Sequence, residues 1–177
     1  LLAPELGVLQ HRTIAPGVIF EDRDLKITAY VTEHPPIEPA VGYRFDYKGR
    51  SVVVSGDGNV NGDTRDIVDG VDLLLHDALS VPTVTALSKA MGAAGRSRQS
   101  KIVSDVMDYH ASTDSLIELG EQSNVDMVAF YHLVPVPLNA VLEDVFKRGM
   151  PENFLLAEDL MSFELPIGSD EIVVNRP

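Results

Sequence analysis

Two short, uninterrupted apolar runs constrain the fold of this 177-residue chain most strongly. They are Val71–Leu75 and Val125–Tyr131. Continuous apolar runs of this length are typical of strands that are buried on both faces, as in a parallel sheet. Helix-like segments lie between the two runs and after them, and strands that alternate with helices indicate an α/β fold.

The first third of the chain has a different pattern, in which β-rich segments are separated by turn residues. Val18–Glu21 and Leu25–Glu33 are rich in β-branched and aromatic residues. Val41–Tyr47 and Ser51–Ser55 flank a short turn, which is a hairpin signature. Between these pairs, His34–Pro39 contains three prolines and predicts a loop. The sheet is therefore expected to be mixed.

The remaining elements complete a single α/β domain. We expect a short helix that is capped by Asp63 and runs through Val68. Further helices are expected over Val84–Ala94, Gln99–Met107, a segment capped by Ser112 or Thr113 and running to about Gln122, and Leu138–Arg148. A last strand is expected over Met161–Leu165. Residues 1–16 are weakly patterned and are interpreted as an extended lead-in to a domain over residues 17–177.

Charge and composition restrict the classes of partner. The formal net charge is −13, which argues against electrostatic capture of nucleic acid or of an anionic membrane. No apolar run approaches the roughly 18 residues that span a bilayer. There is no Cys, so thiolate metal sites are excluded. The chain starts at Leu1, and no signal-like segment follows it, which favours a cytoplasmic location and a chain that begins partway through a longer protein.

Polar side chains follow the predicted strands at the points where loops leave them. Sites of open α/β sheets form at these strand ends. A single His in such a position is most often a hydrogen-bonded loop residue, but four of the five His lie at junctions. Imidazole and carboxylate ligands suit zinc, manganese or iron. The candidate residues are His34, Asp57, His76, Asp77, His110 and His132.

The same junctions carry an ordered set of motifs. They are Glu33-His34-Pro35-Pro36, Ser55-Gly56-Asp57, Asp72-Leu73-Leu74-Leu75-His76-Asp77-Ala78, Tyr109-His110-Ala111-Ser112, Tyr131-His132-Leu133-Val134-Pro135 and Ala157-Glu158-Asp159-Leu160-Met161. In order and spacing they resemble metallo-β-lactamase-fold hydrolases of the RNase Z and arylsulfatase-like branch. The resemblance spans about Ala15 to Leu165 and implies the C-terminal half of an αββα sandwich.

The resemblance also implies a role for each matched residue. His34 would bind a first divalent metal, His132 a second, and Asp57 would bridge the two. The metals, zinc first and manganese or iron as alternatives, would share a hydroxide that attacks the substrate. His110 would pass a proton to the leaving oxygen. Asp77 would be its carboxylate partner, one methylene shorter than the family's usual Glu.

Two departures from the family pattern shape the expected function. The signature His-x-His-x-Asp-His does not occur in the chain, so each metal would keep only two protein ligands, against three or four for zinc. We therefore expect partial metal occupancy and an isolated chain without activity, which is either the C-terminal part of a longer hydrolase or a degenerate remnant of one. The insertion typical of tRNA-processing enzymes is also absent, because only Asp46–Arg50 separate the two strands concerned. With the acidic charge, this favours a small ester, sulfate ester, lactone or phosphodiester as substrate, and no nucleic acid.

Two alternatives of other classes remain open. Half of a two-sheet sandwich would expose an apolar sheet face, so the chain could be a non-catalytic module that associates with itself as a homo-oligomer. Asp57-x-Asn59-x-Asn61-Gly62 matches the first half of a calcium loop, although Val68 occupies its twelfth position. A basic cluster at Arg96, Arg98 and Lys101 is interpreted as a solvated helix face.

Overall fold

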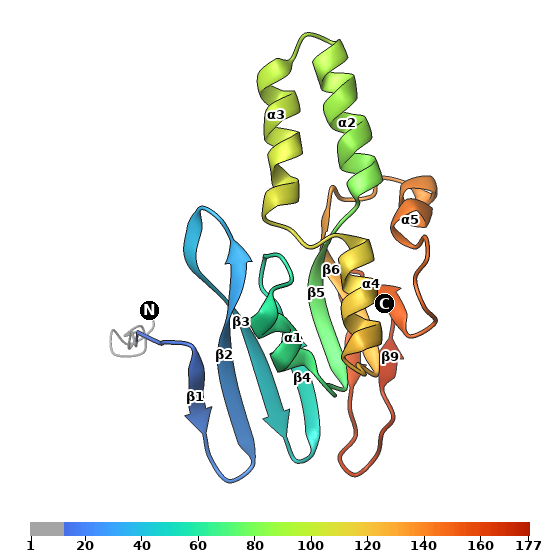
Figure 1. Cartoon of the computed structure of the whole chain (residues 1–177). Coiled ribbons are helices and arrows are strands. Elements are labelled where there is room, and N and C mark those ends of the chain that lie inside the picture. Colours follow the sequence, from blue (N-terminus) through green and yellow to red (C-terminus); the bar gives the residue numbers. More distant parts are fainter. Residues whose placement is uncertain (1–12) are drawn as a thin grey trace, which may run out of the picture.

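The computed structural model describes residues 13–177, in which seven strands form one mixed sheet (Figure 1). Strands β1 to β4 pair antiparallel, and β4 to β7 pair parallel, so the predicted α/β class with a mixed sheet is confirmed. Most of the predicted lead-in lies outside the described residues. In sheet order the strands are β1 (Gly17–Glu21), β2 (Leu25–His34), β3 (Ile37–Tyr47), β4 (Arg50–Val54), β5 (Leu73–Leu79), β6 (Met127–Val134) and β7 (Phe154–Leu156).

The helices divide into a group that covers the sheet and a hairpin that leaves it. The covering helices are α1 (Gly62–Val68), α4 (Thr113–Gln122) and α5 (Ala140–Phe146). Helices α2 (Val81–Ala93) and α3 (Ser97–Asp105) form a hairpin that projects beyond the sheet, at the top of Figure 1. A short 3₁₀ turn, η2 (Val106–Asp108), follows α3, and β8 (Ser162–Glu164) pairs with β9 (Val173–Asn175). None of the helices in residues 13–177 has the length and apolar character needed to cross a bilayer.

The hydrophobic core lies between one sheet face and the covering helices. Val53, Leu74, Val128 and Phe154 occupy neighbouring positions across β4 to β7 on this face. The helices add fully buried side chains, among them Val68 of α1, Leu116 and Leu119 of α4, and Phe146 of α5. On the opposite face Leu73 and Ala129 are buried, whereas five other apolar side chains are only half-buried: Val52, Val54, Leu75, Met127 and Leu155.

Three local predictions differ from the structure at places that position the site. Strand β5 continues to Leu79, so His76 and Asp77 lie inside the strand and not after it. Strand β3 begins at Ile37, within the segment expected to be a loop, and includes Pro39. Helix α1 is capped by Asn61 and not by Asp63: the Asn61 side chain accepts from Thr64 N at 2.9 Å.

Candidate metal centre

The two outer histidines of the candidate site lie at irregularities of the sheet. His34 ends β2, where the pairing with β3 shifts register between Thr32 and His34. His132 is the additional residue of a bulge in β6, because Asp77 pairs with Tyr131 and Ala78 pairs with Leu133. Its φ of 43° is left-handed, which is uncommon for a residue other than glycine. Bulges redirect side chains at sheet ends, so the sheet itself presents both imidazoles at its rim.

Four predicted residues from distant segments meet at this rim. The ring centroids of His34 and His110 are 5.5 Å apart, and those of His110 and His132 are 5.4 Å apart. The Nε2 atom of His132 lies 3.4 Å from Oδ2 of Asp57, which follows β4. The His132 and Asp57 side chains are 47% and 45% exposed, so an incoming ligand could reach them.

The fifth predicted residue, Asp77, lies beneath this cluster and is fully buried. Its Oδ2 atom is 2.7 Å from His110 Nδ1, and its Oδ1 atom is 2.9 Å from His76 Nδ1. Burial alone would raise the pKa of Asp77, but the hydrogen bonds to His110 and His76 outweigh burial and hold this pKa below its ordinary value. Because the ionised carboxylate only accepts, His110 donates its Nδ1–H to Asp77, and its Nε2 atom remains for other partners.

The lowered pKa of Asp77 predicts a pH dependence of stability. The folded-state pKa lies below the ordinary value of 3.8, so ionised Asp77 stabilises the fold above about pH 4. This contribution is lost as the pH falls through the folded-state pKa. We expect Asp77→Asn to lower the free energy of unfolding at pH 7 by about 1–3 kcal/mol, since it leaves a buried imidazole N–H without its acceptor. Between pH 4 and pH 2, stability should fall less steeply in the variant than in the parent.

Urea unfolding at a series of pH values measures both effects. Asp66→Asn, at an exposed position of α1, is the matched control and should retain the parental profile. An acid limb of equal steepness in the parent and in Asp77→Asn would show that Asp77 has no lowered pKa.

Two tyrosines to which the sequence analysis assigned no role in the site adjoin the cluster. The Tyr109 ring packs against the rings of His34 and His110, with centroid distances of 4.9 and 5.0 Å. Burial raises the pKa of Tyr131, so its hydroxyl stays protonated. Both tyrosines directly precede a site histidine in the sequence, and that adjacency was the available signal.

The donors at the rim fit a divalent metal in type but fall short in number. Imidazole nitrogen and carboxylate oxygen suit zinc, manganese and iron. Within residues 13–177, however, no group of three or more such side chains has the arrangement to hold one metal ion. His34, Asp57 and His132 could therefore contribute to a metal site that needs further ligands, as the missing His-x-His-x-Asp-His signature implies.

The calcium-loop alternative receives no support from the side chains of that loop. Asn59 donates its Nδ2–H to the Asp108 carbonyl oxygen at 2.8 Å, and the Asn61 side chain caps α1. Asp57 faces His132. The side chains that a calcium loop would direct to one point are therefore held in three different contacts.

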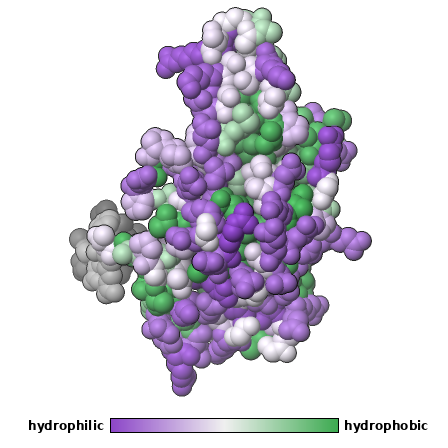
Figure 2. All heavy atoms as spheres, in the orientation of Figure 1, coloured by the Kyte–Doolittle hydropathy of each residue, from purple (hydrophilic) through white to green (hydrophobic). Residues whose placement is uncertain are grey.

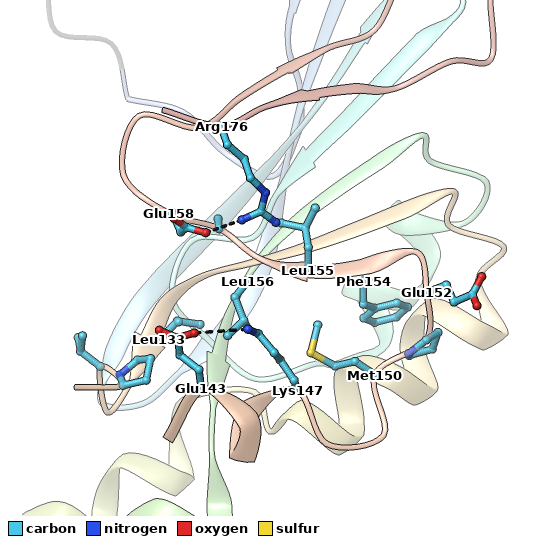
Figure 3. A pocket seen from close by; sticks show the side chains of 14 residues that line it. Leu133, Glu143, Lys147, Met150, Glu152, Phe154, Leu155, Leu156, Glu158 and Arg176 are labelled. Atoms are coloured by element: carbon cyan, nitrogen blue, oxygen red, sulfur yellow. Dashed lines mark hydrogen bonds and ion pairs between the residues drawn. The ribbon is translucent and has the colours of Figure 1, made fainter. Parts of the chain in front are cut away.

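Two hollows flank the histidines. One, of about 600 Å³, lies at the turn between β2 and β3 and includes His34, Glu33 and Ile37 in its wall. The other, of about 490 Å³, lies beside β7 and includes Leu133, which follows His132 (Figure 3). Both basic side chains in this second hollow are paired with glutamates: Lys147 with Glu143, and Arg176 with Glu158.

Comparison with known proteins places this geometry in a family context. No family model matches the chain. Ribonuclease Z from Mycobacterium tuberculosis is 30% identical over 116 residues, which are 64% of this chain and 38% of that protein. The crystal structure of human tRNase Z, short form, superposes with a TM-score of 0.55 at 19% identity, covering 85% of this chain and 47% of that one. This is a metallo-β-lactamase fold, and its sequence is ribonuclease Z-like.

The ribonuclease Z-like chain spans less than half the length of the curated relatives it matches. A further structural neighbour is Zn(2+)-bound PqqB from Methylobacterium extorquens, with a TM-score of 0.51, 18% identity, and coverage of 84% of this chain and 50% of that one. These matches correct one expectation. We expected a small-molecule substrate and no nucleic acid, and the ribonuclease Z and tRNase Z relatives contradict this, because their names describe enzymes that act on RNA. The net charge was a poor guide to the partner, because it is a sum over the whole chain and does not report how charge is distributed over the surface.

Proposed function

We propose that this ribonuclease Z-like chain forms part of the catalytic rim of a metal-dependent phosphodiesterase that cleaves RNA. The observation that carries the proposal is the meeting of His34, His110 and His132 at one end of the sheet, with Asp57 beside His132. The ribonuclease Z relatives support RNA as the substrate, and the zinc-bound structural neighbour supports zinc as the metal.

In this proposal His34, Asp57 and His132 hold two divalent metals together with ligands outside this chain. When bound, the metals would supply Lewis-acid polarisation of the phosphodiester and an activated water. The exposed carboxylate of Asp57 has the charge to draw both cations to the rim, and the ring centroids of His34 and His132 lie 5.5 and 5.4 Å from that of His110.

His110, positioned by Asp77, provides the proton in the same scheme. With its Nδ1–H donated to Asp77, His110 directs Nε2 away from the buried carboxylate. In this orientation a protonated His110 can pass the Nε2 proton to the leaving oxygen of the RNA. Asp77 is thus a positioning residue, and His110 is the group that would touch the reacting atoms.

Metal binding tests this proposal. We expect Asp57→Asn to weaken binding of Zn²⁺ or Mn²⁺ by about 10–100-fold, because the change removes the charge that attracts the cations and keeps the shape of the side chain. Titration calorimetry of the complete natural protein measures the affinity. RNA cleavage by that protein should stop with a chelator and return with the metal.

Asp63→Asn is the matched control, since Asp63 is an exposed aspartate in the first turn of α1. Its metal affinity should equal that of the parent. RNA cleavage that continues in excess chelator, or an equal affinity in Asp57→Asn and the parent, would contradict the proposed function.

A further inference from the structure

The α2–α3 hairpin concentrates positive charge in an otherwise acidic chain. Residues 78–104 contain no Asp or Glu, yet they hold four of the 14 Lys and Arg residues, in a chain of net charge −13. The four are Lys89, Arg96, Arg98 and Lys101, and all are exposed. Hydrophilic side chains stand out on the flanks of this projecting hairpin in Figure 2.

Most of this charge is not neutralised by the protein. Lys101 pairs with Asp105 at 2.9 Å, one turn along α3. The part of the chain from residue 13 onward offers no ion pair to Lys89, Arg96 or Arg98. In the hollow beside β7, by contrast, every basic side chain already has a glutamate partner. Of these two surfaces, only the hairpin presents cations that are free to meet an external anion.

The two helices of the hairpin are joined to each other by side-chain hydrogen bonds. Ser88 Oγ donates to the Ser100 carbonyl oxygen at 2.9 Å, and Ser100 Oγ donates to the Ser88 carbonyl oxygen at 2.8 Å. These reciprocal bonds fix α2 against α3. At the tip, Gly95 has a φ of 75°, a conformation that glycine adopts without strain. Arg96 and Arg98 follow directly and are therefore held at the far end of the projection.

The base of the hairpin is part of the candidate metal centre. Helix α3 leads through η2 directly to Tyr109, which packs on His34, and then to His110. Nine helical residues and a three-residue 3₁₀ turn span roughly 20 Å. A nucleic-acid strand that advances about 3.4 Å per nucleotide could thus reach both His110 and the tip of the hairpin within roughly six nucleotides.

From these observations we propose that the α2–α3 hairpin is an RNA-docking arm that binds the phosphate backbone through Lys89, Arg96 and Arg98. The arm would hold the RNA so that a phosphodiester some nucleotides away reaches His110. Phosphate contacts of this kind position a nucleic acid without reading its sequence. This inference rests on the proposed function for its substrate class, and it adds the surface that selects a long polyanion.

Equilibrium binding with the metal chelated tests the arm separately from catalysis. The probe is a fluorescein-labelled tRNA transcript, and fluorescence anisotropy reports its affinity over a salt series. We expect Arg96→Glu/Arg98→Glu to weaken binding by at least about tenfold at low salt. The slope of log affinity against log salt should also fall by about 1 for each lost contact.

Arg23→Glu/Arg148→Glu is the matched control, because it makes the same change in net charge at two exposed arginines outside the hairpin. It should retain most of the parental affinity. An equal loss of RNA affinity in the two double variants, or no loss in either, would overturn the proposal that the hairpin docks RNA. So would displacement of the RNA by poly-glutamate at a matched charge concentration, which would indicate an acidic protein as the partner. Each of these results leaves the metal-binding and cleavage tests of the proposed function unaffected.

Discussion

Replacing His110 by Gln should lower kcat for RNA cleavage by roughly 10²- to 10⁴-fold and leave KM nearly unchanged. Gln retains a polar group of similar reach but carries no transferable proton at neutral pH. The hydrogen bond from His110 Nδ1 to buried Asp77, 2.7 Å long, orients the imidazole in the parent protein. Loss of the proton donor affects the transition state and not the bound RNA, so the effect should appear in kcat.

The leaving group separates this role from a structural one. With a substrate whose leaving group is p-nitrophenolate, which departs without a proton, the deficit of His110→Gln should shrink markedly. A deficit of equal size for both substrates would contradict proton donation by His110. Asp108→Asn is a suitable control, because its side chain is exposed two positions earlier on the same segment. Its kcat should match that of the parent.

The second large effect concerns the strand that carries His132. We expect Phe130→Ala to lower the free energy of unfolding by about 3–5 kcal/mol. Phe130 is completely buried in β6 and meets Phe154 edge to face, with ring centroids 5.8 Å apart. Truncation to Ala removes the apolar surface of the ring and leaves a cavity between the sheet and its helices. Urea denaturation followed by circular dichroism measures the change.

Phe20→Ala provides the comparison within the same residue type, since Phe20 of β1 is 46% exposed. Phe20→Ala should lower the free energy of unfolding by much less than Phe130→Ala does. If the two variants lost equal stability, the core would not be organised around β6 and β7 as described.

The sequence predicted the architecture well where local pattern and tertiary environment agree. The apolar run before His132 became the buried half of β6, and Ser112 caps α4 through its contact with Ser115 N. The meeting of His34 and His132 at one rim could be anticipated, because both lie on strands of one sheet. His110 reaches the same rim from the segment between η2 and α4, and its place was indicated only by the order of the motifs.

Other features depended on contacts that no local pattern contains. Strand β5 extends through His76 and Asp77 because β6 pairs with it as far as Leu79. Inside the sheet, Nδ1 of His76 lies 2.9 Å from Oδ1 of Asp77. Pro39 is tolerated in β3 because it lies at the register shift opposite Thr32 and His34, where the ladder is interrupted. Asn61 and not Asp63 caps α1, since only Asn61 has the extended backbone of a cap.

The left-handed backbone at His132 has a thermodynamic consequence for the whole protein. Holding a β-carbon in that conformation costs of the order of 1–3 kcal/mol, and Gly or Asn would relieve much of it. Random mutagenesis selected only for heat resistance should therefore enrich Gly or Asn at this position and erase an imidazole in the process. At this bulge, a substitution that raises thermal stability removes the imidazole that the candidate metal centre uses.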